Sequence, residues 1–132
     1  MIDLFTPYEL KDLKLKNRVV LPPMCQYSVT ERDGIATDWH YNHYVSRAVG
    51  GTGLIIIEMT DVEPDGRITD YDLGIWSDEH IPALARIVDA CHAYGAKWAS
   101  RLPMPDARPK TQPFLYPPPR SRSTINPKHP AS

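Results

Sequence analysis

The amino-acid composition changes sharply after Lys97, and this change limits which part of the chain can fold. Residues 98–132 contain no glycine but nine of the fourteen prolines, whereas all seven glycines lie between Gly34 and Gly95. Residues 1–97 carry nine Lys/Arg against fifteen Asp/Glu, and residues 98–132 carry six against one. A segment rich in proline and poor in hydrophobic periodicity does not build a core. We therefore expect the fold within residues 1–97 and a disordered tail over residues 98–132.

The size and the cysteine content place broad limits on the protein. A chain of 132 residues allows one domain with a moderate core. Cys25 and Cys91 are too few for a disulfide framework, which favours a reducing compartment. The N-terminus has an early acid, Asp3, and no apolar stretch reaches the roughly 18 residues of a membrane helix. We expect a cytoplasmic protein with neither a membrane nor a nucleic acid as partner.

The hydrophobic pattern predicts a hairpin followed by two buried strands. Residues 8–16 alternate polar and apolar side chains, which is typical of a half-solvated hairpin. Residues 18–21 form a short apolar run that Pro22 ends. Residues 53–59 are the clearest buried strand, because an apolar run of this kind is typical of a parallel strand covered on both faces.

A helix is expected after each of these strands. Residues 37–48 form the first, with Thr37 or Asp38 as N-cap and glycines after it. The second opens at residues 77–79, with acids at the positive end of the helix dipole. Its apolar positions have helical spacing: Ile81, Leu84, Val88 and Cys91. Alternating strands and helices indicate a parallel α/β fold, and two such units leave a barrel and an open sheet equally possible.

The segment after the first strand is the main candidate for a functional site. It comprises residues 22–28, with the sequence Pro-Pro-Met-Cys-Gln-Tyr-Ser. Active sites of parallel α/β folds lie at the carboxyl ends of the strands. The Cys25 sulfur and the Tyr27 phenol could face a ligand together there. A proline-stiffened loop with a core cysteine explains the position equally well.

Other polar residues have ordinary structural explanations. His40 and His43 are three apart on the first helix, but no third ligand is near in the sequence, so a structural helix face is favoured over a metal site. Glu58 ends a buried strand, and pairing with a basic group is favoured over a role as a base. Asp70 and Asp72 are expected in a solvated loop. We predict no metal ligand and no catalytic residue in this chain.

Four separated segments occur in the order found in one enzyme family. They are Leu-Phe-Thr-Pro at 4–7, Leu-Lys-Asn-Arg-Val-Val at 15–20, Pro-Met-Cys-Gln-Tyr-Ser at 23–28, and the stretch 66–80. Together they resemble the Old Yellow Enzyme family, above all its bacterial, thermophilic-like NADPH dehydrogenase branch. The resemblance covers residues 1–97 and implies the N-terminal fragment of a (β/α)8 TIM barrel, comprising the hairpin and about two βα units.

The resemblance implies a function and a set of contacts. Members of the family bind FMN and use NAD(P)H to reduce activated C=C bonds of α,β-unsaturated carbonyl compounds, and full-length relatives are expected to be homo-oligomers. Tyr27 would contact the substrate, and the Cys25 sulfur would tune the flavin. Pro22 departs from the small polar residue expected at its position. The implied flavin contacts are Pro22, Pro23, Met24, Cys25 and Met59.

The tail supports two different interpretations. Residues 117–122 are proline-rich and basic, and such a segment can bind a partner as a polyproline helix, which would make the chain a non-enzymatic interaction protein. Alternatively, the codons that these residues permit allow a continuous string in the neighbouring frame, VGIQIAHAGRKAEDAVPV followed by Ser or Pro and PSAIPFDDQSKTPRE. That string resembles the continuation of the family, which indicates loss of one base near codons 97–98. A weaker third possibility is another flavin- or phosphate-binding barrel enzyme.

The frame interpretation has structural consequences. Arg101 stands where the family has a flavin-binding glutamine. Pro103 and Pro105 should keep the residues after Lys97 out of a central sheet. We expect this truncated chain to bind FMN poorly, to be inactive, and to aggregate through exposed strand edges.

Overall fold

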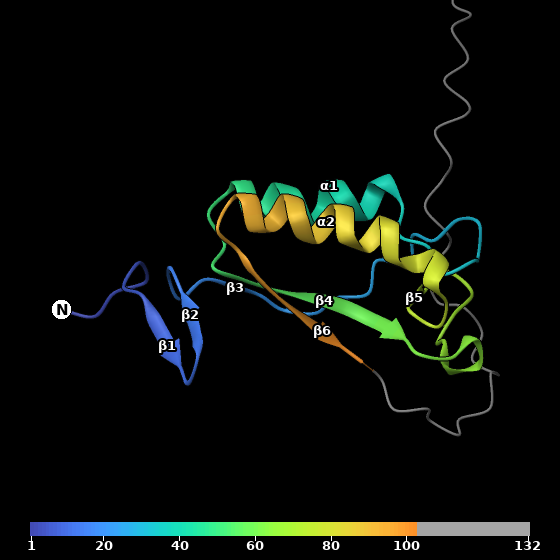
Figure 1. Ribbon diagram of the computed structural model, residues 1–132, viewed down its shortest axis with the longest axis horizontal. Coiled ribbons are helices and arrows are strands. Elements are labelled where there is room, and N and C mark those ends of the chain that lie inside the picture. The colour runs from blue at the N-terminus through green and yellow to red at the C-terminus, as the bar shows by residue number, and fades with distance from the viewer. Residues whose placement is uncertain (103–132) are drawn as a thin grey trace, which may run out of the picture.

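The computed structural model describes residues 1–102 as an antiparallel hairpin attached to an open, mainly parallel sheet with two helices on one face (Figure 1). No helix in this part of the chain is long and apolar enough to cross a bilayer. The strands are β1 (Tyr8–Leu10), β2 (Leu13–Leu15), β3 (Val20–Leu21), β4 (Leu54–Asp61), β5 (Leu73–Gly74) and β6 (Lys97–Arg101). The helices are α1 (Asp38–Val49) and α2 (Ile81–Ala93), with single 3-10 turns η1 (Pro64–Gly66) and η2 (Asp78–His80).

Strand β4 is the centre of the sheet. β3 pairs with it in parallel on one side and β6 on the other, and both pairs begin at Leu54. β5 adds a short parallel pair at the far end of β4, where Thr60 lies opposite Leu73. The described residues therefore form a partial α/β sheet that is not closed into a barrel. This arrangement agrees with the fragment of a βα fold that the sequence predicts.

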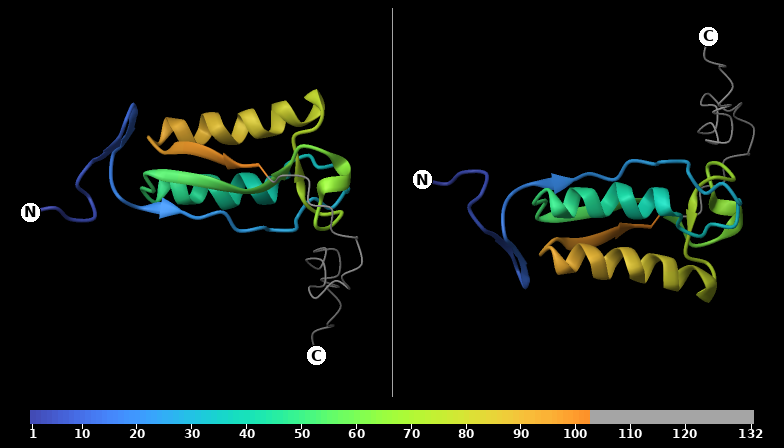
Figure 2. Two further views of the ribbon diagram at one scale, coloured as in Figure 1. Left: turned by 90° about the horizontal axis from the view of Figure 1, so that it is seen from below. Right: turned by 90° about the horizontal axis from the view of Figure 1, so that it is seen from above.

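The core lies between the sheet and the two helices. Ile55 and Ile57 of β4 are at most 1% exposed and form one cluster with residues of both helices. The cluster members from the helices are Tyr44, Ala48, Ile87 and Cys91. Figure 2 shows both helices on the same side of the strands, so the opposite face of the sheet has no helix over it among residues 1–102. Two βα units therefore bury only the face of the sheet that their helices cover.

The predicted capping of α1 is confirmed, and the face predicted for α2 needs one correction. Thr37 is the N-cap of α1 and Gly50 its C-cap. On α2, Ile81 is 53% exposed, whereas Ile87 is 1% exposed and belongs to the core. Ile81 is at the surface because α2 begins there, directly after the turn η2, and Pro82 lies in its first turn.

The expectation that the chain leaves the sheet after Lys97 is wrong for the first four residues. β6 continues to Arg101, and its register runs from Lys97 opposite Leu54 to Arg101 opposite Met59. Residues 98–101 contain no proline, so every backbone N–H can join the ladder. The Trp98 ring also packs edge-on against Tyr44, with centroids 5.4 Å apart. The predicted disorder of residues 103–132 lies outside the described residues.

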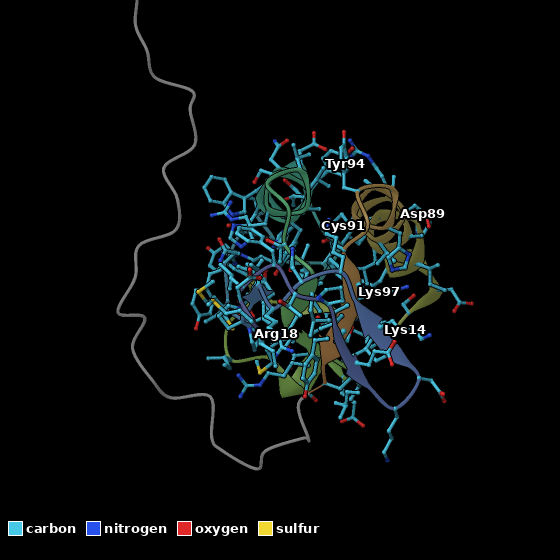
Figure 3. The ribbon with its side chains drawn as sticks, turned by 90° about the vertical axis from the view of Figure 1, so that its left-hand side faces the viewer. Lys14, Arg18, Asp89, Cys91, Tyr94 and Lys97 are labelled. Carbon is cyan, nitrogen blue, oxygen red and sulfur yellow. The ribbon has the colours of Figure 1, made fainter. Side chains whose placement is uncertain are left out.

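The hairpin lies at the amino ends of the parallel strands, away from the loop that follows β3 (Figure 1). Its contact with the rest of the fold comes from β2 onward: the Lys16 ammonium donates to the Tyr94 carbonyl at 2.6 Å, and the Asn17 amide donates to the Gly51 carbonyl at 2.7 Å. Figure 3 views the molecule from this end, with Tyr94 and Cys91 on the α2 side. The hairpin therefore covers the bottom of the sheet and leaves the carboxyl edge free.

Candidate functional site

The predicted site residues lie at one edge of the sheet. The segment 22–28 follows directly on β3. Met59 lies near the end of strand β4, and its register partner is Arg101 at the end of β6, next to a β-bulge. All three strands are parallel, so their carboxyl ends meet at the same side of the molecule (Figure 1). The same edge of the sheet therefore carries Pro22, Pro23, Met24, Cys25, Tyr27 and Met59. Their contacts with a flavin or a substrate stay predictions.

The segment 22–28, called here the site loop, presents part of its surface to solvent. Pro22 is exposed and Met24 is 45% exposed, whereas Cys25 and Tyr27 are half-buried. Tyr27 has a φ of 50°, the left-handed region that few side chains adopt. Its hydroxyl forms a hydrogen bond with the Cys25 sulfur. The two side chains expected to face a ligand together are therefore neighbours.

The surroundings of Cys25 keep its thiol protonated. Burial raises the pKa of Cys25 above its ordinary value, and the negative charges of Glu58 and Asp72 raise it further. A hydrogen bond from the Met59 backbone and one from Tyr27 act in the opposite direction. A neutral thiol is polarizable but weakly nucleophilic, which suits contact with a ligand better than attack on one.

Glu58 lies beneath the site loop and is 1% exposed. Its Oε2 accepts a hydrogen bond from the Gln26 backbone N–H at 2.8 Å, and its Oε1 accepts one from the Tyr44 hydroxyl at 2.7 Å. The Glu58 backbone N–H in turn donates to the Tyr44 oxygen at 3.0 Å. Burial raises the pKa of Glu58 to about 7, against the lowering effect of these two donors. Glu58 therefore titrates near neutral pH.

Glu58 lies beside a basic residue, His40, as predicted, but the two do not form a charged pair. His40 Nε2 is 3.8 Å from Glu58 Oε1, but burial lowers the pKa of His40 to about 4, so the ring is neutral at pH 7. The Thr37 backbone N–H donates to His40 Nδ1 at 3.0 Å, which assigns the ring proton to Nε2. His40 thus closes the first turn of α1, the structural role favoured from the sequence. Among residues 1–102 no group of three His, Cys, Asp or Glu side chains could hold a metal ion.

The expectation that Asp72 lies in a solvated loop is wrong, although Asp70 is exposed as predicted. Asp72 is 2% exposed because its Oδ2 accepts the backbone N–H groups of Ile68 and Thr69 at 2.7 and 3.1 Å. The Thr69 hydroxyl donates to Oδ1 at 2.8 Å. A threonine three residues before an aspartate is a local signal for such a turn, and it was available in the sequence.

Asp61 ends β4 beside this turn and is fully buried. Neither of its carboxylate oxygens has a hydrogen-bond partner within residues 1–102. Burial and the Asp72 charge raise the pKa of Asp61 to about 6, while Arg67 lowers it. Like Glu58 and Tyr44, Asp61 has no sequence pattern that marks it, because its environment is created only when β4, β5 and η1 meet.

Comparisons with known proteins identify the family. The profile of the NADH:flavin oxidoreductase / NADH oxidase family matches residues 3–104. An NADPH dehydrogenase from Listeria monocytogenes is 61% identical over 102 residues, and one from Bacillus subtilis is 54% identical over 99 residues. These matches cover 77% and 75% of this chain but only 30% and 29% of the relatives. The chain thus spans about a third of the length of the curated relatives it matches.

Solved structures agree with this result. An Old Yellow Enzyme from Pichia sp. superposes with a TM-score of 0.70 at 32% identity, over 76% of this chain and 26% of that one. Morphinone reductase superposes with a TM-score of 0.68 at 35% identity, over 75% and 25%. The family match extends to residue 104, so it includes β6. On its sequence and its fold, the chain belongs to the NADH:flavin oxidoreductase / NADH oxidase family.

Proposed function

We propose that this chain is the N-terminal part of an FMN-dependent NADPH oxidoreductase that reduces activated C=C bonds of α,β-unsaturated carbonyl compounds. The observation that carries the proposal is the convergence of the site loop and Met59 at the carboxyl edge of the sheet. The relatives named NADPH dehydrogenase support the reductant. A cytoplasmic location and a homo-oligomeric full-length protein belong to the same proposal, and the two free cysteines are compatible with a reducing compartment.

The site loop offers groups that fit a flavin. Within residues 1–102, no hydrogen bond occupies the backbone N–H of Met24 or Cys25, so both remain available to the polar edge of a ring. Pro22, Pro23 and Met24 supply an apolar surface that a flat aromatic system can cover. The small polar side chain expected at position 22 is replaced by proline, so this contact would be apolar here. The residues present fit an isoalloxazine ring.

Each residue has a separate part in this proposal. Pro22, Pro23, Met24 and Met59 would bind and orient the flavin, and the neutral Cys25 thiol would adjust its potential by a polarizable contact. The Tyr27 hydroxyl would donate a hydrogen bond to the substrate carbonyl. Bound at this edge, FMN would supply hydride transfer from NADPH to the β-carbon of the enone.

The chain alone provides only part of such a site. It corresponds to about 30% of its relatives, and Arg101 places a cation opposite Met59 where the resemblance implies an uncharged glutamine. We propose that the reading frame is lost after Lys97 and that residues 98–132 are out of frame. The chain as given would then bind FMN poorly, be inactive, and be prone to aggregate at its open sheet edges.

The experiment restores one base after codon 97 and compares the resulting protein with the chain as given. We expect the restored protein to oxidise NADPH faster when a cyclic enone is supplied as the electron acceptor than when it is absent, and the 132-residue chain to be inactive. A Tyr27→Phe variant of the restored protein should have a raised KM for the enone, because a donor to the carbonyl is lost. An inactive restored protein, or a string in the neighbouring frame that differs from the one above, would show that the proposal is wrong.

A further inference from the structure

The site loop is attached to the sheet by one side chain from below. The Gln26 backbone N–H donates to Glu58 Oε2 at 2.8 Å, a bond between residues 32 positions apart. The Gln26 side chain then fixes its neighbours: its amide donates to the Met24 carbonyl at 3.0 Å, and its oxygen accepts from the Trp39 indole at 3.2 Å. The position of Gln26 therefore determines the position of Met24 and Cys25.

Glu58 itself is held rigidly. The Tyr44 hydroxyl donates to its carboxylate at 2.7 Å and accepts from its backbone N–H at 3.0 Å, so α1 fixes both the side chain and the strand. Tyr44 is 1% exposed, and its ring packs against Trp98 of β6 and His43 of α1. An acceptor that is buried and doubly fixed is well suited to hold a loop in one place.

The charge of Glu58 is not balanced by a cation. The titratable groups that face it are His40 and Tyr44 from α1 and Cys25 from the site loop, with Asp72 acting at longer range from the segment before β5. His40 is neutral, Tyr44 remains protonated, and Asp72 is an acid. An ionised Glu58 thus acts on the Cys25 sulfur as an unneutralised negative charge in a region poor in water.

We propose that Glu58 is a positioning residue of the site loop, which holds Gln26 in place and controls the reactivity of the Cys25 sulfur through its own ionisation. Its oxygens do not contact the expected ligand surface; it acts through the Gln26 backbone and through its charge. The relevance to a flavin rests on the proposed function. The thiol chemistry can be measured without flavin, so the two proposals fail independently.

The test measures alkylation of Cys25 by iodoacetamide in the 132-residue chain across a range of pH, with each cysteine followed by mass spectrometry. In Glu58→Gln the negative charge is absent and the Gln26 anchor is weakened, so Cys25 should react about tenfold faster at pH 8, which corresponds to about one pKa unit. Glu63→Gln is the matched control, because Glu63 is an exposed acid just after β4. Its Cys25 should react like that of the unmodified chain.

Cys91 reports on the fold in the same experiment. It is fully buried between the helices and the sheet, near the hairpin end of the molecule (Figure 3). Faster reaction at Cys25 with Cys91 still protected supports the proposal, and unchanged reaction at both overturns it. If Cys91 becomes reactive, the variant has unfolded, and the proposal is then tested by the pH dependence of Cys25 alkylation in the unmodified chain. The logarithm of its Cys25 rate, plotted against pH, must then depart from a slope of one as Glu58 titrates near pH 7, because the new negative charge raises the pKa of Cys25. A plot that keeps a slope of one through pH 7 overturns the proposal.

Discussion

Replacing Tyr44 by phenylalanine tests the buried cluster that supports the site loop. The ring keeps its place in the core, where it is 1% exposed and packs against Trp98. Only the hydroxyl is lost, and with it the donor to Glu58 Oε1 and the acceptor for the Glu58 backbone N–H. The Glu58 carboxylate and the Glu58 backbone N–H then stay buried, and each has lost one hydrogen-bond partner.

The magnitude follows from what each group loses. A buried backbone N–H without a partner costs about 1–3 kcal/mol, and a hydrogen bond to a charged group contributes about 1.5–3 kcal/mol. We expect Tyr44→Phe to lower the free energy of unfolding by about 3 kcal/mol at pH 8, where Glu58 is ionised. At pH 5 Glu58 is protonated, because its pKa is about 7, and the loss should be about 2 kcal/mol. The difference of about 1 kcal/mol corresponds to a rise of about one unit in the pKa of Glu58, because the carboxyl of the variant is then only half ionised at pH 8.

Urea denaturation at pH 5 and pH 8, followed by tryptophan fluorescence, measures both values. Tyr41→Phe is the matched control on the same helix, since no hydrogen bond of the Tyr41 hydroxyl is found among residues 1–102 and its ring stays over Arg86 at 4.0 Å. The control should change stability by about 0.5 kcal/mol or less. Equal losses at the two pH values, or a loss no larger than that of the control, would show that the Tyr44–Glu58 contact does not hold the cluster together.

Three further predictions concern the same fold. Between pH 4.5 and 7 folded Glu58 keeps a proton that the unfolded chain has released, so its contribution favours low pH and falls by about 3 kcal/mol as pH rises; Glu58→Gln should remove this contribution from the urea midpoints. The slope of Asp61, which has the same sign, and that of His40, which has the opposite sign, stay in both proteins. Ile57→Ala should cost about 3 kcal/mol in the same assay because Ile57 is 1% exposed, whereas Ile68→Ala, at a 61% exposed position, should cost about 0.5 kcal/mol or less. Gly34→Ala should lower the thermal midpoint more than Gly51→Ala, because both have positive φ but only at Gly34 would a Cβ lie 2.5 Å from Trp76; equal shifts would contradict the steric argument.

Local patterns in the sequence predict most of the secondary structure. The cap at Thr37, the apolar run of β4 and the alternation of the hairpin are signals that a few residues carry without help from the rest of the fold. β5 is missed because two residues form it, and only the neighbouring end of β4 makes them a strand. β6 does not follow from the composition of residues 98–132, because their prolines begin at Pro103 and the four residues that extend the strand contain none.

For the candidate site, too, local sequence patterns predict only a part. Its position after β3 follows from the parallel α/β pattern, and the residues implied by the family resemblance do meet at one edge. The support beneath it does not follow from the sequence, because Glu58 and Tyr44 are 14 residues apart and Glu58 and Gln26 are 32 apart. Such contacts depend on how α1 crosses β4, which periodicity does not determine. The burial of Asp72 was accessible in part, through its local spacing from Thr69.

The central claim is that the carboxyl edge of β3, β4 and β6 is a flavin site that the chain as given leaves incomplete. The most direct measurement is the flavin absorbance that co-elutes with protein after incubation with FMN and gel filtration, compared between the chain as given and the protein translated after one base is restored at codon 97. We expect FMN in equimolar amount on the restored protein and little FMN on the 132-residue chain. Equimolar FMN on the chain as given, or none on a folded restored protein, would contradict it.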